Sequence, residues 1–371
     1  MLTKKVAAAF ALGAVLIALG LASAQTGGDK KKPEDKKKPP AGVWASLDDP
    51  NLPADYKFQG EYVGEIQGGG KLGAQVIALD KGAFQAVLLP GGLPGAGWDG
   101  KNKILLDGQL EGDVVVFKAV SPGKRKYLGQ LPAEFSATAK FPPPGQKDYN
   151  ASISKDLLSG NTDDKKPFEL KKITRKSPTL GQKAPDGAVI LFDGSSKDEW
   201  NGGRLDKTTN LLNTDGSDIT TKRKFSSYTV HVEFLLPFKP AGREQGRGNS
   251  GFYQVDHYEV QILYSFGLDG KNNECGGVYS QIDPKVNACL PPLQWQTYDV
   301  EFTNAVRDGD KLVTKSRLTV RHNGILIHDN VELKGVTGGA RKEPEGTPGV
   351  LRLQGHGNPL QFRNIWIVEK K

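Results

Sequence analysis

Apolar and polar residues alternate with a period of two along most of this chain, which is the pattern of half-buried β-strands. Runs with the period of a helix are few, and 46 Gly and 23 Pro among 371 residues predict many turns. In the N-terminal half we expect strands at residues 56–66, 72–79, 83–89, 104–110, 113–120, 135–141 and 168–173. In the C-terminal half we expect them at residues 189–193, 228–236, 251–264, 277–281, 296–304, 316–322, 325–328, 349–354 and 361–368. The pattern therefore predicts an all-β protein.

The chain begins with a segment typical of a secretory signal peptide. In residues 1–24, Lys4 and Lys5 precede an apolar run that ends in Ala22-Ser23-Ala24, a small-x-small cleavage site. The apolar run is short for a membrane span and has no basic residues after it that would stop transfer. We therefore expect this segment to be removed and the mature protein to be secreted or periplasmic, with no stable membrane span.

Breaks in the alternating pattern divide the rest of the chain. Residues 25–42 form a Lys/Pro-rich tract that is expected to be a disordered linker. Residues 43–174 should form a β-sandwich or barrel, for which the sequence indicates no catalytic role. Residues 175–186, with two X-Pro steps, read as a second linker. Residues 187–371 contain many strands without βαβ alternation, which predicts a two-sheet antiparallel sandwich.

Charge and cysteine content narrow the range of functions. Residues 1–40 hold eight Lys against three acids, so they account for most of the net charge of +8. The folded part is close to neutral, and nothing indicates nucleic-acid binding. Cys275 and Cys289 are expected to form a loop-closing disulfide, as suits an exported protein. With no C-x-x-C and only five His, the sequence predicts no zinc site of the usual kind. No cofactor is expected either, because the G-x-G-x-x-G match at residues 246–251 precedes a strand and not a helix.

Residues 248–263 (GNSGFYQVDHYEVQIL) carry polar groups where a purely structural strand would be apolar. If they form one strand, its two faces differ. One holds Phe252, Gln254, Asp256, Tyr258, Val260 and Ile262, and the other holds Tyr253, Val255, His257, Glu259, Gln261 and Leu263. On the second face His257, Glu259 and Gln261 follow one another at intervals of about 7 Å. An acid, a base and an amide on one surface indicate a polar ligand.

A second expected strand, at residues 228–236, has a polar face formed by His231 and Glu233. If the polar faces of the two strands coincide, His231, Glu233, His257, Glu259 and Gln261 form one cluster. The alternative is a solvated outer face, which is common on antiparallel sheets. Gln354 and His356 at the end of another strand favour a site, as do Gly248 and Gly251, which permit close backbone approach.

These residues recur in a known family. The order of motifs closely resembles the 3-keto-disaccharide hydrolase family (DUF1080) from Gly187 to the C-terminus. The motifs are Leu191-Phe192-Asp193-Gly194 with Trp200, His231-Val232-Glu233-Phe234, Gly248-Asn249-Ser250-Gly251, Tyr258-Glu259-Val260-Gln261-Ile262-Leu263, Trp295 with Tyr298, His322 with Gly324, Leu353-Gln354 with His356-Gly357, and Phe362-Arg363-Asn364-Ile365. The resemblance implies a concanavalin A-like jelly-roll sandwich. It also implies an enzyme that cleaves 3-keto-glycosides, by hydrolysis or by 1,2-elimination followed by hydration.

The resemblance also implies roles for individual residues. Glu259 and His356 are the first candidates for the acid and the base, with Glu233 as a further catalytic candidate. The candidates for substrate binding are Asn249, Tyr253, His257, Gln261, Gln354 and Arg363. Many relatives have Asp immediately before the His of the last motif, where this chain has Gly355.

Two other functions are compatible with the same residues. A sandwich of this kind also serves as a non-catalytic, lectin-like carbohydrate-binding module. Alternatively, Glu233 and Glu259 could act as the carboxylate pair of an ordinary glycosidase, which needs a separation of about 5 Å or about 6.5–9.5 Å.

Overall fold

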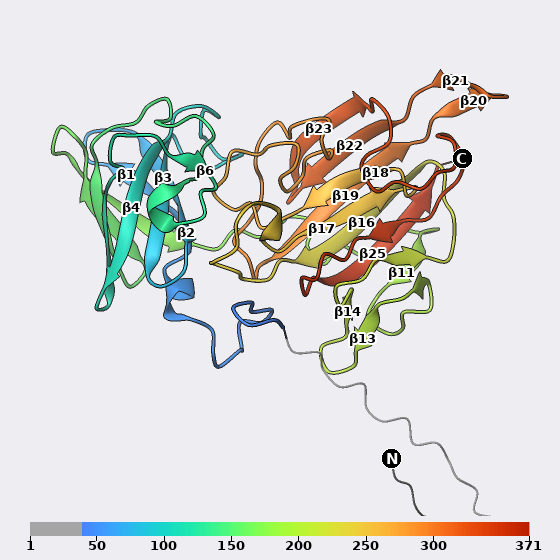
Figure 1. Cartoon of the computed structure of the whole chain (residues 1–371), viewed down its shortest axis with the longest axis horizontal. Coiled ribbons are helices and arrows are strands. Elements are labelled where there is room, and N and C mark those ends of the chain that lie inside the picture. The colour runs from blue at the N-terminus through green and yellow to red at the C-terminus, as the bar shows by residue number, and fades with distance from the viewer. Residues whose placement is uncertain (1–38, 371) are drawn as a thin grey trace, which may run out of the picture. The chain divides into compact units, whose positions relative to one another are not determined.

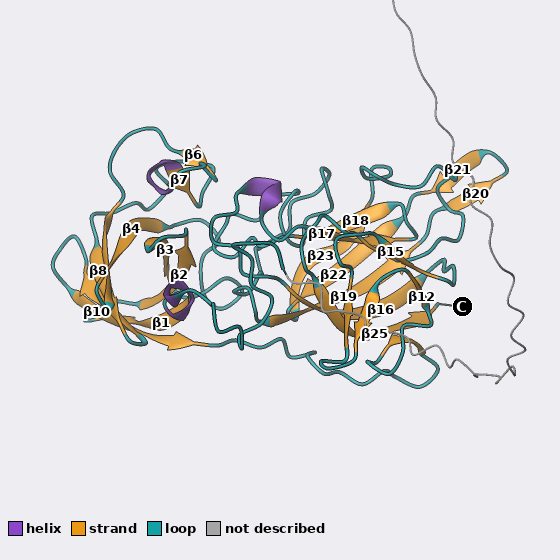
Figure 2. Cartoon of the chain, turned by 60° about the horizontal axis from the view of Figure 1, so that its bottom comes forward, coloured by secondary structure: helices purple, strands orange, loops and turns teal. Residues whose placement is uncertain are grey.

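The computed structural model describes residues 39–370, which form strands and, as helical elements, three short 3-10 helices (Figures 1 and 2). The predicted all-β class is confirmed. The predicted signal peptide and nearly all of the Lys/Pro linker lie outside the described residues. Within residues 39–370, no helix has the length and apolar character needed to cross a membrane.

The N-terminal strands close into an antiparallel barrel, which decides between the two expected architectures. Its strands, in spatial order, are β1 (Gly60–Ile66), β10 (Pro167–Ile173), β9 (Leu157–Asn161), β8 (Asn150–Ser154), β5 (Val114–Ala119), β4 (Ile104–Glu111), β3 (Ala83–Pro90) and β2 (Lys71–Ala78). Strands β4 and β5, both expected, form a hairpin with Glu111 paired to Val114. The expected strand at residues 135–141 is reduced to β7 (Phe135–Ser136), which pairs with β6 (Lys126–Tyr127).

The C-terminal strands form two sheets packed face to face, as expected for a sandwich. The eight-stranded sheet contains β11 (Val189–Phe192), β13 (Arg204–Asp206), β14 (Leu211–Asn213), β16 (Tyr228–Leu235), β19 (Trp295–Thr303), β22 (Arg317–His322), β23 (Ile325–Glu332) and β25 (Gln361–Glu369). The five-stranded sheet contains β12 (Trp200–Asn201), β15 (Ile219–Thr221), β24 (Arg352–Leu353), β17 (Ser250–Gln254) and β18 (Tyr258–Ile262). A separate ribbon joins β20 (Val306–Asp308) and β21 (Lys311–Thr314).

Aromatic side chains join the two sheets across the sandwich core. Phe302 of β19 lies 5.3 Å from Tyr228 of β16 and 5.7 Å from Tyr258 of β18, between ring centroids. All three side chains are fully buried. Because Tyr258 and Phe302 belong to different sheets, their contact fixes which face of each sheet points inward and which points to solvent.

The expected long strand at residues 251–264 is instead the hairpin β17–β18. Val255 and Asp256 have φ of +44° and +59°, and the His257 N–H donates to the Gln254 carbonyl at 2.9 Å. The sequence lacks the Asn-Gly or Asp-Gly signal of such a turn, so the pattern did not reveal it. Gln254 pairs with Tyr258, so three residues separate the strands and odd-numbered residues of both strands share a face. Tyr253, Glu259 and Gln261 therefore share a face, as expected, although the single long strand was wrong.

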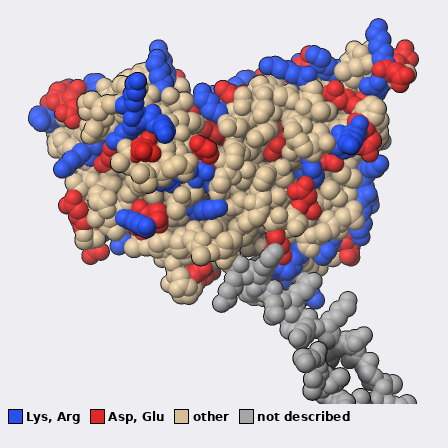
Figure 3. Space-filling view, in the orientation of Figure 1, with Lys and Arg blue, Asp and Glu red and all other residues tan. Residues whose placement is uncertain are grey.

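Charges of both signs are spread over the described surface. On the face shown in Figure 3, Lys and Arg side chains are interspersed with Asp and Glu. This distribution agrees with the near-neutral balance expected for the folded part of the chain.

Candidate functional site

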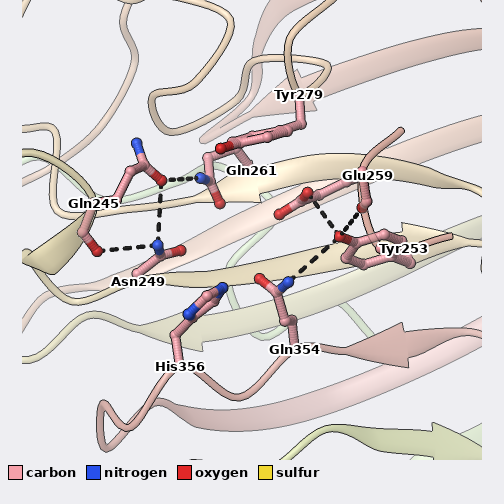
Figure 4. A pocket seen from close by; sticks show the side chains of 10 residues that line it. Gln245, Asn249, Tyr253, Glu259, Gln261, Tyr279, Gln354 and His356 are labelled. Carbon is pink, nitrogen blue, oxygen red and sulfur yellow. Dashed lines mark hydrogen bonds between the residues drawn. The ribbon is translucent and has the colours of Figure 1, made fainter. Parts of the chain in front are cut away.

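A pocket of about 210 Å³ lies on the face of the five-stranded sheet that points away from the sandwich core (Figure 4). It is lined by Gln245, Asn249, Tyr253, Glu259, Gln261, Tyr279, Gly338, Gly339, Gln354 and His356. Six of these residues were candidates from the sequence: Asn249, Tyr253, Glu259, Gln261, Gln354 and His356. The structure thus brings most of the predicted site together in one cavity.

Strand pairing explains how these residues meet. In the β17–β18 register Tyr253 faces Glu259 and Gly251 faces Gln261. The segment after β24 joins them because the Gln354 N–H donates to the Gly251 carbonyl at 2.8 Å. Gln354 and His356 therefore reach the same cavity from a neighbouring strand (Figure 4).

Glu259 is the acidic group of this pocket. Its side chain is almost completely buried, and burial raises its pKa to about 7, against the opposing effects of the Tyr253 hydroxyl and Arg352. Asp218 adds a smaller effect that raises the pKa. A carboxyl with a pKa near neutrality can both accept and return a proton under ordinary conditions.

Tyr253 links Glu259 to the turn that contains Gly338. Its hydroxyl lies 2.9 Å from Glu259 Oε2 and 2.7 Å from the Gly338 carbonyl oxygen. One hydroxyl hydrogen serves only one acceptor at a time. When Glu259 is ionised, Tyr253 donates to it; when Glu259 is protonated, Glu259 donates to Tyr253, which then donates to Gly338. The geometry accommodates both protonation states of Glu259 without moving a heavy atom.

Arg352 supports Tyr253 from behind. Its guanidinium lies 3.8 Å from the centroid of the Tyr253 ring, within the range of a cation–π contact. Ion pairs hold the guanidinium in place, with Asp218 at 3.1 Å and Asp256 at 2.8 Å. The orientation of Tyr253, and through it that of Glu259, therefore depends on residues outside the pocket.

Gly251 leaves room for the Glu259 carboxyl group. A Cβ added at Gly251 would lie 2.2 Å from Glu259 Oε1, well inside van der Waals contact. The expectation that this glycine permits close approach is confirmed, and the approaching group is the carboxyl of Glu259.

Amide side chains form the opposite side of the pocket. Gln245 Oε1 accepts hydrogen bonds from Asn249 Nδ2 at 3.2 Å and from Gln261 Nε2 at 2.9 Å (Figure 4). Amides both donate and accept hydrogen bonds, as a ligand with several hydroxyl groups requires. None of the residues that line the pocket is Lys or Arg, so the lining suits a neutral ligand.

Glu233 and Arg363 lie elsewhere, so the expected five-residue cluster is wrong. Both belong to the eight-stranded sheet, on its outer face, where Arg363 Nε lies 2.7 Å from Glu233 Oε2. Burial raises the pKa of Glu233, but hydrogen bonds from His231, Asn364, Gly181 and Arg363 outweigh it and lower that pKa to about 2. The polar faces of β16 and β18 point away from a common core, which alternation within each strand does not disclose.

His257 also lies outside the pocket lining. It is the last residue of the β17–β18 turn, where its Nε2 lies 2.8 Å from the Glu343 carbonyl oxygen. Burial lowers its pKa, which favours the neutral imidazole. The strand pattern placed His257 beside Glu259 only because it assumed that the strand continued.

Residues 175–186, expected to be a linker, cover the outer face around Glu233. Thr179 Oγ1 donates to Asp299 at 2.7 Å, and the Gly181 N–H donates to Glu233 at 2.5 Å. Asn364 Nδ2 donates to the Gln182 carbonyl at 3.0 Å. This segment forms hydrogen bonds with polar groups of β16, β19 and β25, of which Glu233 is fully buried.

Sequence reasoning missed Gln245, Tyr279, Gly338 and Gly339. Gln245 lies in the short 3-10 helix Glu244–Gly246, and the other three lie in turns. Tyr279 was inside an expected strand, and its N–H does pair with the Glu259 carbonyl at 3.1 Å, beside β18. An expected strand at Tyr279 could therefore have placed this residue beside Glu259, whereas the sequence around Gln245, Gly338 and Gly339 gave no such indication.

Cys275 and Cys289, which are expected to form a disulfide, are free, buried thiols in the structure, and their side chains interact with each other. Cys275 Sγ lies 3.2 Å from the Tyr298 hydroxyl, and Cys289 Sγ lies 3.5 Å from the Leu290 carbonyl oxygen. Each sulfur thus has a polar partner in addition to the second cysteine, and the disulfide stays a prediction. Spacing in the sequence did not predict these partners.

Comparisons with known proteins concern the C-terminal half of the chain. A proposed glycosyl hydrolase of Parabacteroides distasonis shares 30% identity over 50% of this chain and 85% of its own, with a TM-score of 0.46. A second from the same organism shares 18% identity over 50% of this chain and 95% of its own, with a TM-score of 0.37. No curated protein matches the chain.

The family comparison covers the whole of the sandwich. Residues 187–368 match the model of the 3-keto-alpha-glucoside-1,2-lyase-like domain. The resemblance inferred from the ordered motifs is confirmed, and the jelly-roll-like sandwich agrees with it. Through residues 187–368, this chain belongs to the 3-keto-alpha-glucoside-1,2-lyase-like family of carbohydrate-active proteins.

Proposed function

We propose that the pocket is the active site of an enzyme that cleaves 3-keto-glycosides by 1,2-elimination, with Glu259 as the base. The observation that carries this proposal is the state of Glu259. It is the one carboxyl group among the residues that line the pocket, and burial raises its pKa to about 7. A base of this strength is suited to removing a proton made acidic by a neighbouring ketone.

The chemistry requires one base and one acid. A ketone at C3 of the sugar acidifies the hydrogen at C2, which Glu259 removes. The electron pair of that C–H bond forms a C1–C2 double bond while the bond from C1 to the glycosidic oxygen breaks. The departing oxygen takes a proton and leaves as an alcohol. His356, across the pocket from Glu259, is the candidate donor of that proton (Figure 4).

The amide side chains on one side of the pocket, here called the amide wall, would hold the substrate during this step. Gln245, Asn249, Gln261 and Gln354 present donors and acceptors to sugar hydroxyls and to the ketone oxygen. Tyr279, partly exposed at the pocket, offers an aromatic face to a sugar ring. Water added to the double bond would give the net result of hydrolysis, so the two outcomes expected from the sequence differ only in a later step.

The position of Glu233 argues against an ordinary two-carboxylate glycosidase. That mechanism needs two carboxyl groups on either side of one glycosidic bond, at most about 9.5 Å apart. Glu233 lies on the other sheet, on its outer face, and is held by Arg363 and Asn364. The pocket provides one carboxyl group, which suits elimination better than double displacement.

The test compares an oxidised glycoside with its parent. The purified protein is incubated with an aryl 3-keto-glucoside and with the unoxidised aryl glucoside, and release of the aryl alcohol is followed. Release from the keto compound alone is the expected result. Release from both would support the ordinary glycosidase. Saturable binding without release from either would support a lectin-like module instead.

Tyr253→Phe is expected to shift the pH dependence of kcat/KM toward higher pH. The Tyr253 hydroxyl stabilises ionised Glu259 and lowers its pKa, so its loss raises the pKa further above about 7. Activity requires the ionised base, so it should appear only at higher pH.

Tyr279→Phe is the matched control for that substitution. It also removes a phenolic hydroxyl from the pocket lining, but Glu259 has no hydrogen bond to Tyr279 in the described chain other than from its backbone. The rise of activity with pH should keep its midpoint in this variant. An unchanged midpoint in Tyr253→Phe would contradict the assignment of Glu259 as the base.

A further inference from the structure

Two loops that line the pocket also contact the barrel. The first, residues 239–248, carries Gln245, and the second, residues 265–281, carries Tyr279. Barrel and sandwich belong to one compact unit, so these contacts join parts of a single body. Each loop is held by specific polar groups of the barrel.

Arg243 fastens the first loop. Its Nε donates to the Gly129 carbonyl at 3.1 Å and its Nη2 to the Leu79 carbonyl at 3.2 Å. The guanidinium is buried, and it lies 5.2 Å from the centroid of the Phe135 ring. All three partners belong to the barrel half of the chain. Gln245 follows only two residues later, so the position of Arg243 constrains the pocket wall directly.

Arg247 adds a second buried cation to the same loop. It is 1% exposed, stacks 3.8 Å from the centroid of the Tyr264 ring and has Nη2 3.4 Å from the Ala78 carbonyl oxygen. Its Nε and Nη1 have no hydrogen-bond partner in the described chain. Burying such a group costs free energy. The contact between the buried Arg247 guanidinium and the Ala78 carbonyl therefore belongs to the packing between the loop and the barrel.

Acidic residues fasten the second loop. Asp269 pairs with Lys103 at 2.7 Å and accepts the Ala139 N–H at 2.8 Å, both from the barrel half. The Tyr127 hydroxyl donates to Glu274 Oε1, and Glu274 Oε2 accepts the Gly270 N–H at 2.7 Å. Glu274 thus links the barrel to the backbone of its own loop.

The two loops meet at the pocket through Gln245. Its Nε2 donates to the Asn273 carbonyl of the second loop at 2.8 Å, while its Oε1 accepts from Gln261 at 2.9 Å. The second loop then continues to Tyr279, whose N–H donates to the Glu259 carbonyl at 3.1 Å. A continuous set of hydrogen bonds therefore runs from the barrel to the amide wall.

We propose that the barrel is a scaffold that holds these two walls of the pocket in place, with Arg243 and Tyr127 as positioning residues. The inference rests on the proposed function only in taking the pocket as the active site. Loops contribute accurately to a site when surrounding contacts fix them before substrate arrives. The barrel supplies those contacts.

Hydrogen–deuterium exchange on the full chain tests the proposal. In Tyr127→Phe, amides of residues 265–281 should exchange about tenfold faster because Glu274 loses one of its partners. Amides of β16 and β19 should keep their protection. Tyr62→Phe is the matched control, since it removes a buried hydroxyl whose bond, 2.7 Å to the Phe58 carbonyl, stays within the barrel.

Arg243→Met tests the first loop with a second measurement. Exchange should rise in residues 239–248, and KM for a 3-keto-glycoside should rise several-fold while kcat is nearly retained. A change of fold stability alone would lower the active fraction and leave KM unchanged.

Three results would overturn the scaffold role: unchanged exchange in both loops, an equal rise throughout the sandwich, or the same effect in Tyr62→Phe. Exchange does not require turnover. A lack of activity in every variant would therefore count against the proposed function, while the exchange data would still decide the role of the barrel.

Discussion

Glu259→Gln is expected to abolish turnover of a 3-keto-glycoside and, at the same time, to make the fold more stable above pH 7. Loss of a general base typically lowers the rate by about 10²–10⁴-fold. The amide keeps an oxygen that can accept from the Tyr253 hydroxyl, so the pocket should retain its shape.

The gain in stability follows from the raised pKa. Burial raises the pKa of Glu259 from 4.5 to about 7 in the folded protein. The stabilising contribution of the protonated group is therefore complete below pH 4.5 and is lost as pH rises through about 7. A shift of this size corresponds to a free energy of roughly 3 kcal/mol. The uncharged Gln does not lose this contribution. The difference in free energy of unfolding between the two proteins should therefore develop between pH 4.5 and 7.

Denaturant unfolding at pH 5 and pH 8 measures this difference. The free energy of unfolding of Glu259→Gln should exceed that of the wild type by more at pH 8 than at pH 5. Glu369→Gln, a substitution of an exposed glutamate, is the control and should change neither activity nor the pH dependence. Retained turnover, or a stability difference independent of pH, would contradict the role of Glu259.

Gly355→Asp is expected to destabilise the protein and weaken substrate binding. A Cβ at Gly355 would lie 2.3 Å from backbone atoms of Ser217 and 2.4 Å from Gly216. Backbone atoms cannot move away as the end of a flexible side chain can. The free energy of unfolding should therefore fall by about 1–3 kcal/mol or more. The Asp218 carboxylate, which accepts the Gly355 N–H at 2.8 Å, would also repel a second carboxylate.

Thermal unfolding and KM should be measured for Gly355→Asp, Gly355→Ala and Gly246→Ala. The alanine at 355 meets the same backbone, so it should be destabilised as well, though less than Asp. Gly246 has no atom within 4 Å of an added Cβ and should accept alanine. Higher activity in Gly355→Asp would mean that the backbone of residues 216–218 can move to make room, and that a carboxylate at position 355 contributes to the reaction.

Alternation along the chain predicted which side chains share a face but not which faces meet. Tyr253, Glu259 and Gln261 share a face as expected, because the hairpin loop preserves the odd–even pattern. Glu233 has the same local pattern, yet it belongs to the other sheet. Pairing between distant strands decides that difference, and no single strand carries this information.

Motif order added what periodicity lacked. It assigned roles to Gln354 and His356, which the end of an expected strand had already indicated, and both line the pocket. It did not supply Gln245 or Tyr279, whose positions depend on loops held by the barrel. β8 and β9 were also missed, because their sequences NASIS and LLSGN contain few of the residues typical of strands.

The covering of Glu233 by residues 175–186 has a consequence for domain exchange between proteins. The family similarity begins at residue 187, which suggests a cut there. Yet Ser177, Thr179 and Gly181 satisfy polar groups on the sheet that such a cut would expose. The transferable unit therefore starts near Arg175, about a dozen residues before the boundary that sequence similarity draws.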